Sequence, residues 1–140
     1  MSVRPNRSRL LQSLNLTVIG AGTFVSDEVS VPVGLSSLVT QAIFVRGGGG
    51  TTCDVFLQTS LDNGATWMDI AQWALATTTV TKIHSVRPYT AVAANITPTD
   101  GTMTDNTILD GVLGDRLRVK SIVVGTYSSA STLAVRIVQN

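Results

Sequence analysis

Aspartates are the residues of this chain whose type and spacing are most typical of catalytic groups. Asp54, Asp62, Asp69 and Asp110 flank or lie within the central apolar segments. Two carboxylates that face each other across a glycosidic bond can act as acid and base in hydrolysis. No second motif ties two of these residues together, however, and aspartates beside strands usually form turns. We therefore expect structural roles for them, no catalytic residues and no enzymatic activity.

A metal site or a nucleophile is the next chemistry to consider. Asp100 and Asp105 lie in a polar segment of the kind that supplies calcium ligands, but an Asp-x-Asp-x-Asp pattern is missing. Cys53 is the only cysteine, so the chain forms no internal disulfide and no cysteine-based zinc site. His84 is the only histidine and has no evident partner. The sequence predicts neither a metal site nor a cofactor.

The segment 55–70 predicts two strands joined by a tight turn, because its turn residues tolerate positive φ angles. The spacing Ser60-x-Asp62-x-Gly64-x-x-Trp67 matches the Asp-box hairpin, in which a carboxylate accepts turn amides and a tryptophan packs beneath. Propeller enzymes carry several copies of this motif. This chain has one copy and is too short for a propeller. We therefore predict a structural hairpin built on Ser60, Asp62, Gly64 and Trp67.

Composition favours strands over helices along the whole chain. Threonine, valine and serine dominate, whereas glutamate and lysine, which favour helices, occur only as Glu28, Lys82 and Lys120. β-branched residues favour strands because a helix restricts their χ1 angle. At 140 residues, the chain is long enough for one domain with its own core. We predict an all-β fold: an antiparallel β-sandwich, jelly-roll-like, with eight or nine strands.

Alternating apolar residues between turn signals locate these strands. We expect residues 1–9 to form a flexible basic arm and residues 10–140 to form the sandwich domain. Gly47–Gly50 should make a flexible turn or a place where a neighbouring chain approaches closely. The polar segment 95–107 should be the longest loop and should lie away from the core. The predicted strands are 12–19, 29–33, 37–46, 53–60, 66–74, 79–87, 116–124 and 131–138, with a short one at 89–92.

Charge is sparse and unevenly distributed. The net charge is +1, so the chain has no overall field for nucleic acid or membranes, and no apolar run is long enough to span a membrane. Two basic groups are candidates for binding an acidic surface of a partner or a sister subunit: the N-terminal arm and a stripe on one strand face. The stripe could also meet nucleic acid, and the alternative is a solvated outer face balanced by Asp110 or Asp115. These candidate residues are Arg4, Arg7, Arg9, Arg116, Arg118 and Lys120.

Low charge also points to assembly. Charged residues make up 14% of the chain, against about 25% in typical soluble domains. A small domain with so few charges either exposes a surface rich in serine and threonine or hides part of its surface in an oligomer. We expect a homo-oligomer that covers apolar patches.

Two segments resemble small virion structural proteins of tailed bacteriophages. One is Val55–Ala71, which contains the hairpin, and the other is Asp110–Val119, which contains the run Gly-Asp-Arg-Leu-Arg. The resemblance implies a virion component, most simply a head decoration or cement protein with a jelly-roll-like sandwich. It also implies a position on the capsid surface and the major capsid protein as partner. A homotrimer would suit the three-fold positions of an icosahedral lattice. No catalytic residues come with the resemblance.

Two other interpretations stay open. Within the same class, the protein could belong to the tail, the neck or a head fibre. In a different class, it could be a carbohydrate-binding sandwich that uses Trp67, Trp73 or Tyr89 as stacking platforms. Aromatic residues make up only 5% of the chain, and the hairpin already accounts for Trp67, which weighs against sugar binding.

Overall fold

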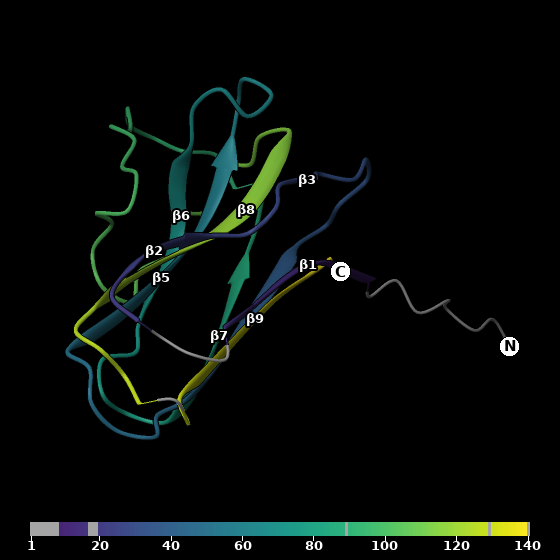
Figure 1. The fold of residues 1–140 in the computed structure, drawn as a ribbon. Helices are drawn as coiled ribbons and strands as arrows, with labels where there is room; N and C mark the ends of the chain where they lie inside the picture. The colour runs from purple at the N-terminus through teal and green to yellow at the C-terminus, as the bar shows by residue number, and fades with distance from the viewer. Residues whose placement is uncertain (1–8, 17–19, 89, 129, 140) are drawn as a thin grey trace, which may run out of the picture.

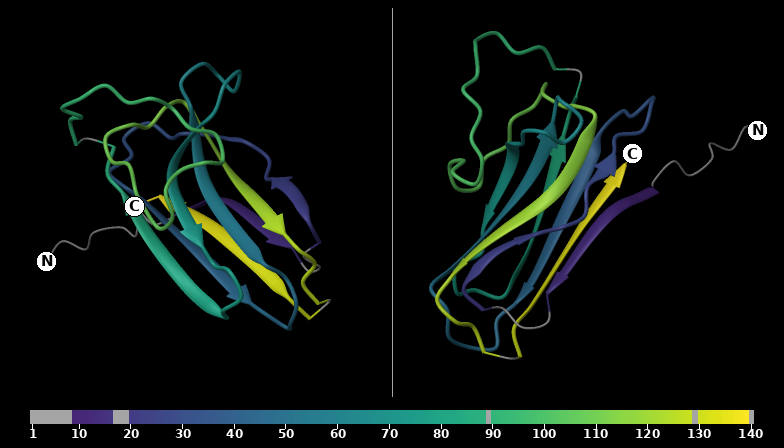
Figure 2. Two further views of the ribbon diagram at one scale, coloured as in Figure 1. Left: turned by 90° about the vertical axis from the view of Figure 1, so that its left-hand side faces the viewer. Right: turned by 45° about the horizontal axis from the view of Figure 1, so that its top comes forward.

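The chain folds into two antiparallel β-sheets that pack face to face (Figures 1 and 2). The computed structural model describes residues 9–16, 20–88, 90–128 and 130–139, and no helix occurs in those ranges. The fold is an all-β sandwich, which confirms the predicted fold class. The described residues contain nine strands, which agrees with the expected number.

Each sheet combines strands from distant parts of the sequence. Sheet A has the order β1, β9, β4, β7, with β1 at Arg9–Leu16, β9 at Thr132–Gln139, β4 at Leu38–Val45 and β7 at Val80–Val86. Sheet B has the order β2, β8, β5, β6, with β2 at Gly22–Val25, β8 at Arg116–Val124, β5 at Thr52–Ser60 and β6 at Met68–Ala74. The short β3, at Val29–Ser30, also pairs with β8.

The strand pairs are nested in the sequence. β5 pairs with β6 and β4 pairs with β7, while β2 pairs with β8 and β1 pairs with β9. All four pairs are antiparallel. Because of this order, each sheet needs a strand from the last quarter of the chain to join its parts, β8 in sheet B and β9 in sheet A.

Alternation along the strands sends one face of each sheet into the space between them. In β4, Leu38, Thr40, Ala42 and Phe44 are fully buried, while the side chains that alternate with them are partly or fully exposed. The largest fully buried side chain is Trp73 of β6. Tyr127 packs edge-on against Phe44, with 5.5 Å between the ring centroids. The main apolar core therefore lies between the two sheets.

Two predicted strands differ from the structure in their bounds. The first strand begins at Arg9 rather than near residue 12, so Arg9 belongs to the sandwich and not to the arm. The strand predicted at 29–33 is limited to Val29–Ser30. Pro32 accounts for the early end, because proline lacks the N–H that a strand ladder needs.

Two further expectations about strands were wrong. Residues 90–92 form no strand. Conversely, the sequence does not predict β2 at Gly22–Val25, because its first residue belongs to the run Gly20-Ala21-Gly22, which favours a turn. Its strand conformation depends on pairing with β8, a contact that local sequence does not reveal.

The long polar segment after β7 covers the free edge of β6. Gln72 donates its backbone N–H to the Thr107 carbonyl at 3.0 Å, and Leu109 donates its N–H to the Ile70 carbonyl at 2.8 Å. Residues 95–107 contribute nothing to the core between the sheets, as predicted, and Figure 2 shows the segment wrapped over the side of sheet B. The segment therefore shields this edge from pairing with another chain.

The turn Gly47–Gly50 is a place of close approach within the chain. Gly50 has a φ of +77°, and a Cβ at this position would collide with the ring of Tyr127. Ser128 donates its N–H to the Gly48 carbonyl at 2.8 Å, which joins the turn to the segment after β8. The approach is thus made by Tyr127 and Ser128 of the same chain.

Candidate functional site

The predicted hairpin is present, and its polar side chains bond to one another. The Ser60 hydroxyl accepts the N–H of Gly64 at 2.8 Å and donates to Asp62 Oδ1 at 2.8 Å. Asp62 also accepts the backbone N–H and the hydroxyl of Thr66, at 2.8 and 2.6 Å. The Thr66 hydroxyl and amide, followed by the Ser60 hydroxyl, lower the pKa of the Asp62 carboxyl to about 2. These residues therefore build the turn.

Trp67 packs less deeply than the hairpin motif predicts. Its side chain is only partly buried, and the guanidinium of Arg118 lies 4.3 Å from the centre of its ring. This geometry is that of a cation–π contact. One face of the ring is therefore covered by an arginine of β8.

The basic stripe of β8 lies on the outer face of sheet B. Arg116 is the first of its three residues, and it donates to Asn63 Oδ1 at 2.8 Å. Its guanidinium also lies 3.8 Å from the Glu28 carboxylate. The exposed end of the stripe is thus bonded to the hairpin and to the segment before β3. The sequence candidates for balancing the stripe, Asp110 and Asp115, are not its ion-pair partners.

The other two residues of the stripe are bonded to the same chain as well. Arg118 donates from Nε to Gln58 Oε1 at 2.8 Å. Lys120 forms an ion pair with Asp100 at 2.8 Å, and its side chain is 15% exposed. The structure therefore brings the stripe together, as strand alternation predicts, but directs its charges toward side chains of this chain.

Gln58 and Asp69 form the buried centre of a polar network on this face. Gln58 is 0% exposed and Asp69 is 2% exposed. The Gln58 amide donates to Asp69 at 2.8 Å and to Asp100 at 2.7 Å. With Arg118 and Lys120 as further members, the network joins β5, β6 and β8 to the loop that carries Asp100.

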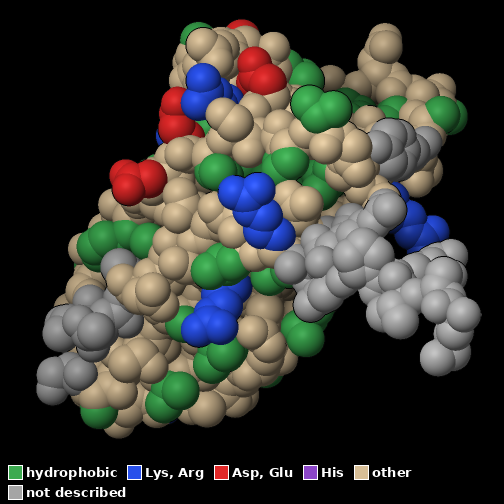
Figure 3. Space-filling model, turned by 90° about the vertical axis from the view of Figure 1, so that its right-hand side faces the viewer, with side chains coloured by type: hydrophobic (Ala, Val, Ile, Leu, Met, Phe, Trp, Pro, Cys, Tyr) green, Lys and Arg blue, Asp and Glu red, His purple; other side chains and the backbone are tan. Residues whose placement is uncertain are grey.

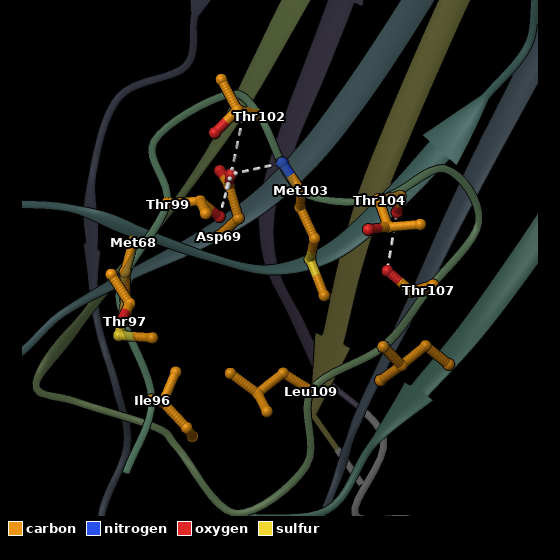
Figure 4. Close-up of a pocket in the computed structure, with 11 residues that line it drawn as sticks. Met68, Asp69, Ile96, Thr97, Thr99, Thr102, Met103, Thr104, Thr107 and Leu109 are labelled. Atoms are coloured by element: carbon orange, nitrogen blue, oxygen red, sulfur yellow. Dashed lines mark hydrogen bonds between the residues drawn. The ribbon is translucent and has the colours of Figure 1, made fainter.

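Asp69 holds this loop by accepting several of its donors (Figure 4). Gly101, Thr102 and Met103 donate their backbone N–H groups to Asp69 Oδ2 at 2.8, 3.2 and 3.2 Å. The Thr99 hydroxyl donates to the same oxygen at 2.9 Å. Successive backbone amides around one carboxylate form an anion-binding nest. The Asp69 carboxylate is therefore engaged in holding the loop.

A groove of about 360 Å³ lies between this anchor and the loop (Figure 4). Its walls are mainly apolar, with Met68 from β6 and Ile96, Met103 and Leu109 from the loop. Asp69 is the only charged residue among those that line it, and its oxygens are already bonded. The groove can hold an apolar group, but its lining offers no free acid, base or nucleophile.

The remaining aspartates have separate structural surroundings. Burial and the nearby Asp105 raise the pKa of Asp54. Asp105 accepts a hydrogen bond from the Gln72 amide at 3.2 Å, and Asp110 accepts the backbone N–H of Arg87 at 2.8 Å. In the described ranges, no three or more histidine, cysteine, aspartate or glutamate residues are placed to hold a metal ion.

Cys53 and His84 are core residues. Cys53 is fully buried, and burial raises the pKa of its thiol to about 11, so the thiol is neutral near pH 7. His84 is 8% exposed, and its ring centre lies 4.4 Å from that of Trp73. Burial and the charge of Lys82 lower the pKa of His84.

The other sequence candidates divide between the core, the surface and the part of the chain that is not described. Trp73 is fully buried, so its ring is closed to a sugar. Arg9 begins β1 and is exposed. Arg4, Arg7 and Tyr89 lie outside the described residues.

The sequence predicts the hairpin but not the anchoring of the loop by Asp69. The hairpin residues lie close together in the sequence, whereas Asp69 and Gly101 are 32 positions apart. One signal was available: Gln58, Asp69 and Gln72 are polar residues within otherwise apolar strands. Buried polar side chains need hydrogen-bond partners, so such residues predict that another segment covers them.

No known protein family, curated protein or solved structure matches this chain. Within the described ranges, no helix is long and apolar enough to cross a membrane.

Proposed function

We propose that this protein is a structural component of a bacteriophage virion that binds the assembled capsid and stabilises it. In this proposal it is a decoration protein on the capsid surface, its partner is the major capsid protein, and it catalyses no reaction. A protein that binds the assembled lattice, and not its separate subunits, stabilises the lattice according to its concentration and affinity.

The observation that carries the proposal is the contrast between two outer faces of the sandwich. On sheet B, the polar side chains that looked chemical are bonded to the chain's own loop and hairpin, as with Asp69 and Lys120. On sheet A, apolar side chains such as Ile43 and Ile83 are exposed. A sandwich whose polar side chains are bonded within the chain on one face, and whose other face is apolar, is suited to assembly with further protein subunits rather than to catalysis.

Two finer features belong to the proposal. The nested strand pairing is the order in which a chain wound as a jelly roll places its strands, and this supports the jelly-roll-like fold. A homotrimer would bind several lattice sites at once and would gain affinity through multivalency. Its three-fold symmetry would match the three-fold positions of an icosahedral shell.

Cosedimentation tests the proposal. Purified protein is mixed with shells assembled from the major capsid protein encoded in the same genome, and separately with tails from the same source. We expect saturable binding to the shells and a higher temperature of shell disruption. Binding to tails alone would support a tail component instead, and binding to neither particle would overturn the proposal.

Sugar binding is not proposed. Trp73 is buried, and Arg118 covers one face of the Trp67 ring, which weighs against both as stacking platforms for a saccharide. Binding of the protein to a glycan array would contradict this conclusion.

A further inference from the structure

The outer face of sheet A is a broad surface with almost no charge. Its side chains are the outward-pointing residues of the four strands, which alternate with the buried ones. Figure 3 looks at this side of the molecule, where hydrophobic side chains are scattered among neutral ones, basic side chains lie in the middle and at the right of the view, and the acidic side chains are confined to its upper part. Its main apolar residues are Leu10, Val39, Ile43, Val45, Ile83 and Val138.

Several of these apolar side chains are strongly exposed. Ile83 is 60% exposed, Leu10 is 54%, Val45 is 42% and Ile43 is 37%. Four strands about 4.8 Å apart, with about 3.3 Å per residue, give an eight-residue face a footprint of roughly 500 Å². A stable interface covers about 800 Å² of accessible surface on each partner. The face is therefore large enough to form most of one.

Other routes to association are blocked within the described residues. Two sheet edges carry the protections that soluble sheets use against pairing. The 95–107 segment covers β6. On β7, Lys82 points inward and donates to the Ala74 carbonyl at 2.9 Å.

The remaining two edges are also poor templates for pairing. β1 carries a bulge between Leu10 and Gln12, and the Gln12 side chain accepts the Ser13 N–H at 2.9 Å. At the edge of sheet B, β2 and β3 have only four and two residues. The outer face of sheet B is bonded to the 95–107 segment through Asp69 and Lys120. The outer face of sheet A is thus the large apolar surface that remains.

The charge of Arg136 on this face indicates which kind of contact can cover the face. Arg136 is exposed on β9, and its side chain forms no ion pair or hydrogen bond with the described residues. The same face carries no carboxylate in the described part of the chain. Packing it against an identical face would therefore leave two arginines without anions. A head-to-tail contact avoids this, because the neighbour presents a different surface, and exposed carboxylates such as Asp27 and Asp105 lie elsewhere on the chain.

We propose that the outer face of sheet A packs against a second copy of this chain in a closed head-to-tail ring, with a carboxylate of the neighbour opposite Arg136. Head-to-tail contacts that close make cyclic oligomers, and they leave no exposed copy of the face. This inference rests on the oligomeric part of the proposed function and names the surface that forms the oligomer.

Sedimentation velocity and light scattering over a range of protein concentrations test the inference. The unaltered protein should have a mass of three chains of 14.7 kDa each. Ile83→Asp and Ile43→Asp should each weaken the oligomer about tenfold or more, because each places a carboxylate in a desolvated apolar contact. Arg136→Glu should weaken it as well, since it removes the cation that the neighbour's carboxylate meets.

Leu61→Asp is the matched control, because Leu61 is 66% exposed on the hairpin and lies off this face. It should leave the mass unchanged, and all four variants should keep the circular dichroism spectrum of the unaltered protein. A monomeric unaltered protein would overturn the inference. So would face variants that associate normally.

Shell binding separates this inference from the proposed function. A monomer that still binds shells would overturn the ring and leave the capsid role intact. A ring that is broken by Ile83→Asp but binds no shells would support the interface and overturn the capsid role.

Discussion

Asp62 shows how a few short hydrogen bonds act on an exposed carboxyl. The Thr66 and Ser60 donors lower its pKa in the folded protein to about 2, while an unfolded aspartate has a pKa of about 3.9. The folded state therefore binds the proton less readily, so the stability from these bonds is present above about pH 4 and is lost as the pH falls toward 2. Asp62→Asn should flatten the dependence of melting temperature on pH in that window.

The measurement has two parts. A carbon NMR titration should give Asp62 a midpoint near pH 2, and thermal unfolding between pH 5 and 2 should compare the variant with the unaltered protein. Equal slopes in this range would show that the hairpin bonds do not distinguish the two protonation states.

His84 predicts a second pH effect in a separate window. Burial and Lys82 lower its pKa, so the unfolded chain, with a histidine pKa of about 6.5, takes up the proton first as the pH falls. Stability is thus full above about pH 6.5 and decreases below it. Because the chain has one histidine, His84→Leu should make the free energy of unfolding nearly constant between pH 7 and 5.

Urea unfolding at several pH values checks this prediction. A decrease in stability between pH 7 and 5 that is the same with and without the histidine would assign the effect to other groups.

Residues that act locally could be predicted from the sequence, and those that act at a distance could not. The Ser60 to Trp67 spacing encodes the hairpin, because its bonds join residues at most four positions apart. The cover on Trp67 comes from Arg118, which no local pattern indicates. The hairpin was therefore confirmed, while the depth at which its tryptophan is buried was wrong.

At the scale of elements, Asp69 connects a strand to its cover. Asp69→Ala removes the acceptor of the Gly101, Thr102 and Met103 amides, so we expect a loss of about 3 kcal/mol in the free energy of unfolding. Hydrogen exchange should also become faster at the Gln72 amide, which bonds to the loop. Chemical unfolding and exchange measured by mass spectrometry check both effects.

Asp27→Ala is the control for this variant, because Asp27 is exposed and its carboxylate makes no bond with the described residues. It should leave stability and exchange unchanged. Unchanged exchange at Gln72 in Asp69→Ala would show that the loop stays on β6 without its anchor.

The glycine turn gives a prediction with a built-in comparison. Gly50 and Gly34 have nearly the same φ, +77° and +80°, but a Cβ at Gly34 meets nothing within 4 Å. Gly34→Ala should cost about 1 kcal/mol from backbone strain alone. Gly50→Ala adds a collision with Tyr127 and should cost about 3 kcal/mol or more. Thermal unfolding of both variants measures the difference, and equal losses would mean that Tyr127 moves aside freely.

Strand positions were predictable where the apolar alternation is long, as in β4 and β5. They were not predictable at β2, whose conformation is imposed by its pairing with β8. For the same reason, the sequence predicts a loop at residues 95–107 but does not reveal that this loop covers the edge of β6. In each case, the missing information is a contact between distant segments.

At the scale of the whole molecule, the predicted N-terminal arm, which precedes the described residues, gives a prediction about capsid binding. Because β1 begins at Arg9, deletion of residues 2–8 removes Arg4 and Arg7 and leaves every described strand intact. We expect an unchanged melting temperature, weaker binding to capsid shells and a smaller effect of salt on the remaining affinity. Cosedimentation at about 50 mM and about 300 mM salt checks this prediction. Unaltered binding would remove the arm from the mechanism.

The nested strand order also sets the time at which the molecule can form. Among the described strands, β1 has one neighbour in its sheet, β9, which comes last in the chain order of those strands. During synthesis, the first strand must therefore remain without its sheet partner until the final strand has left the ribosome. Chains dominated by such distant pairings fold slowly, in milliseconds to seconds. A ribosome that stops before β9 would thus release a chain whose first described strand also has no partner, and not merely one that lacks β9.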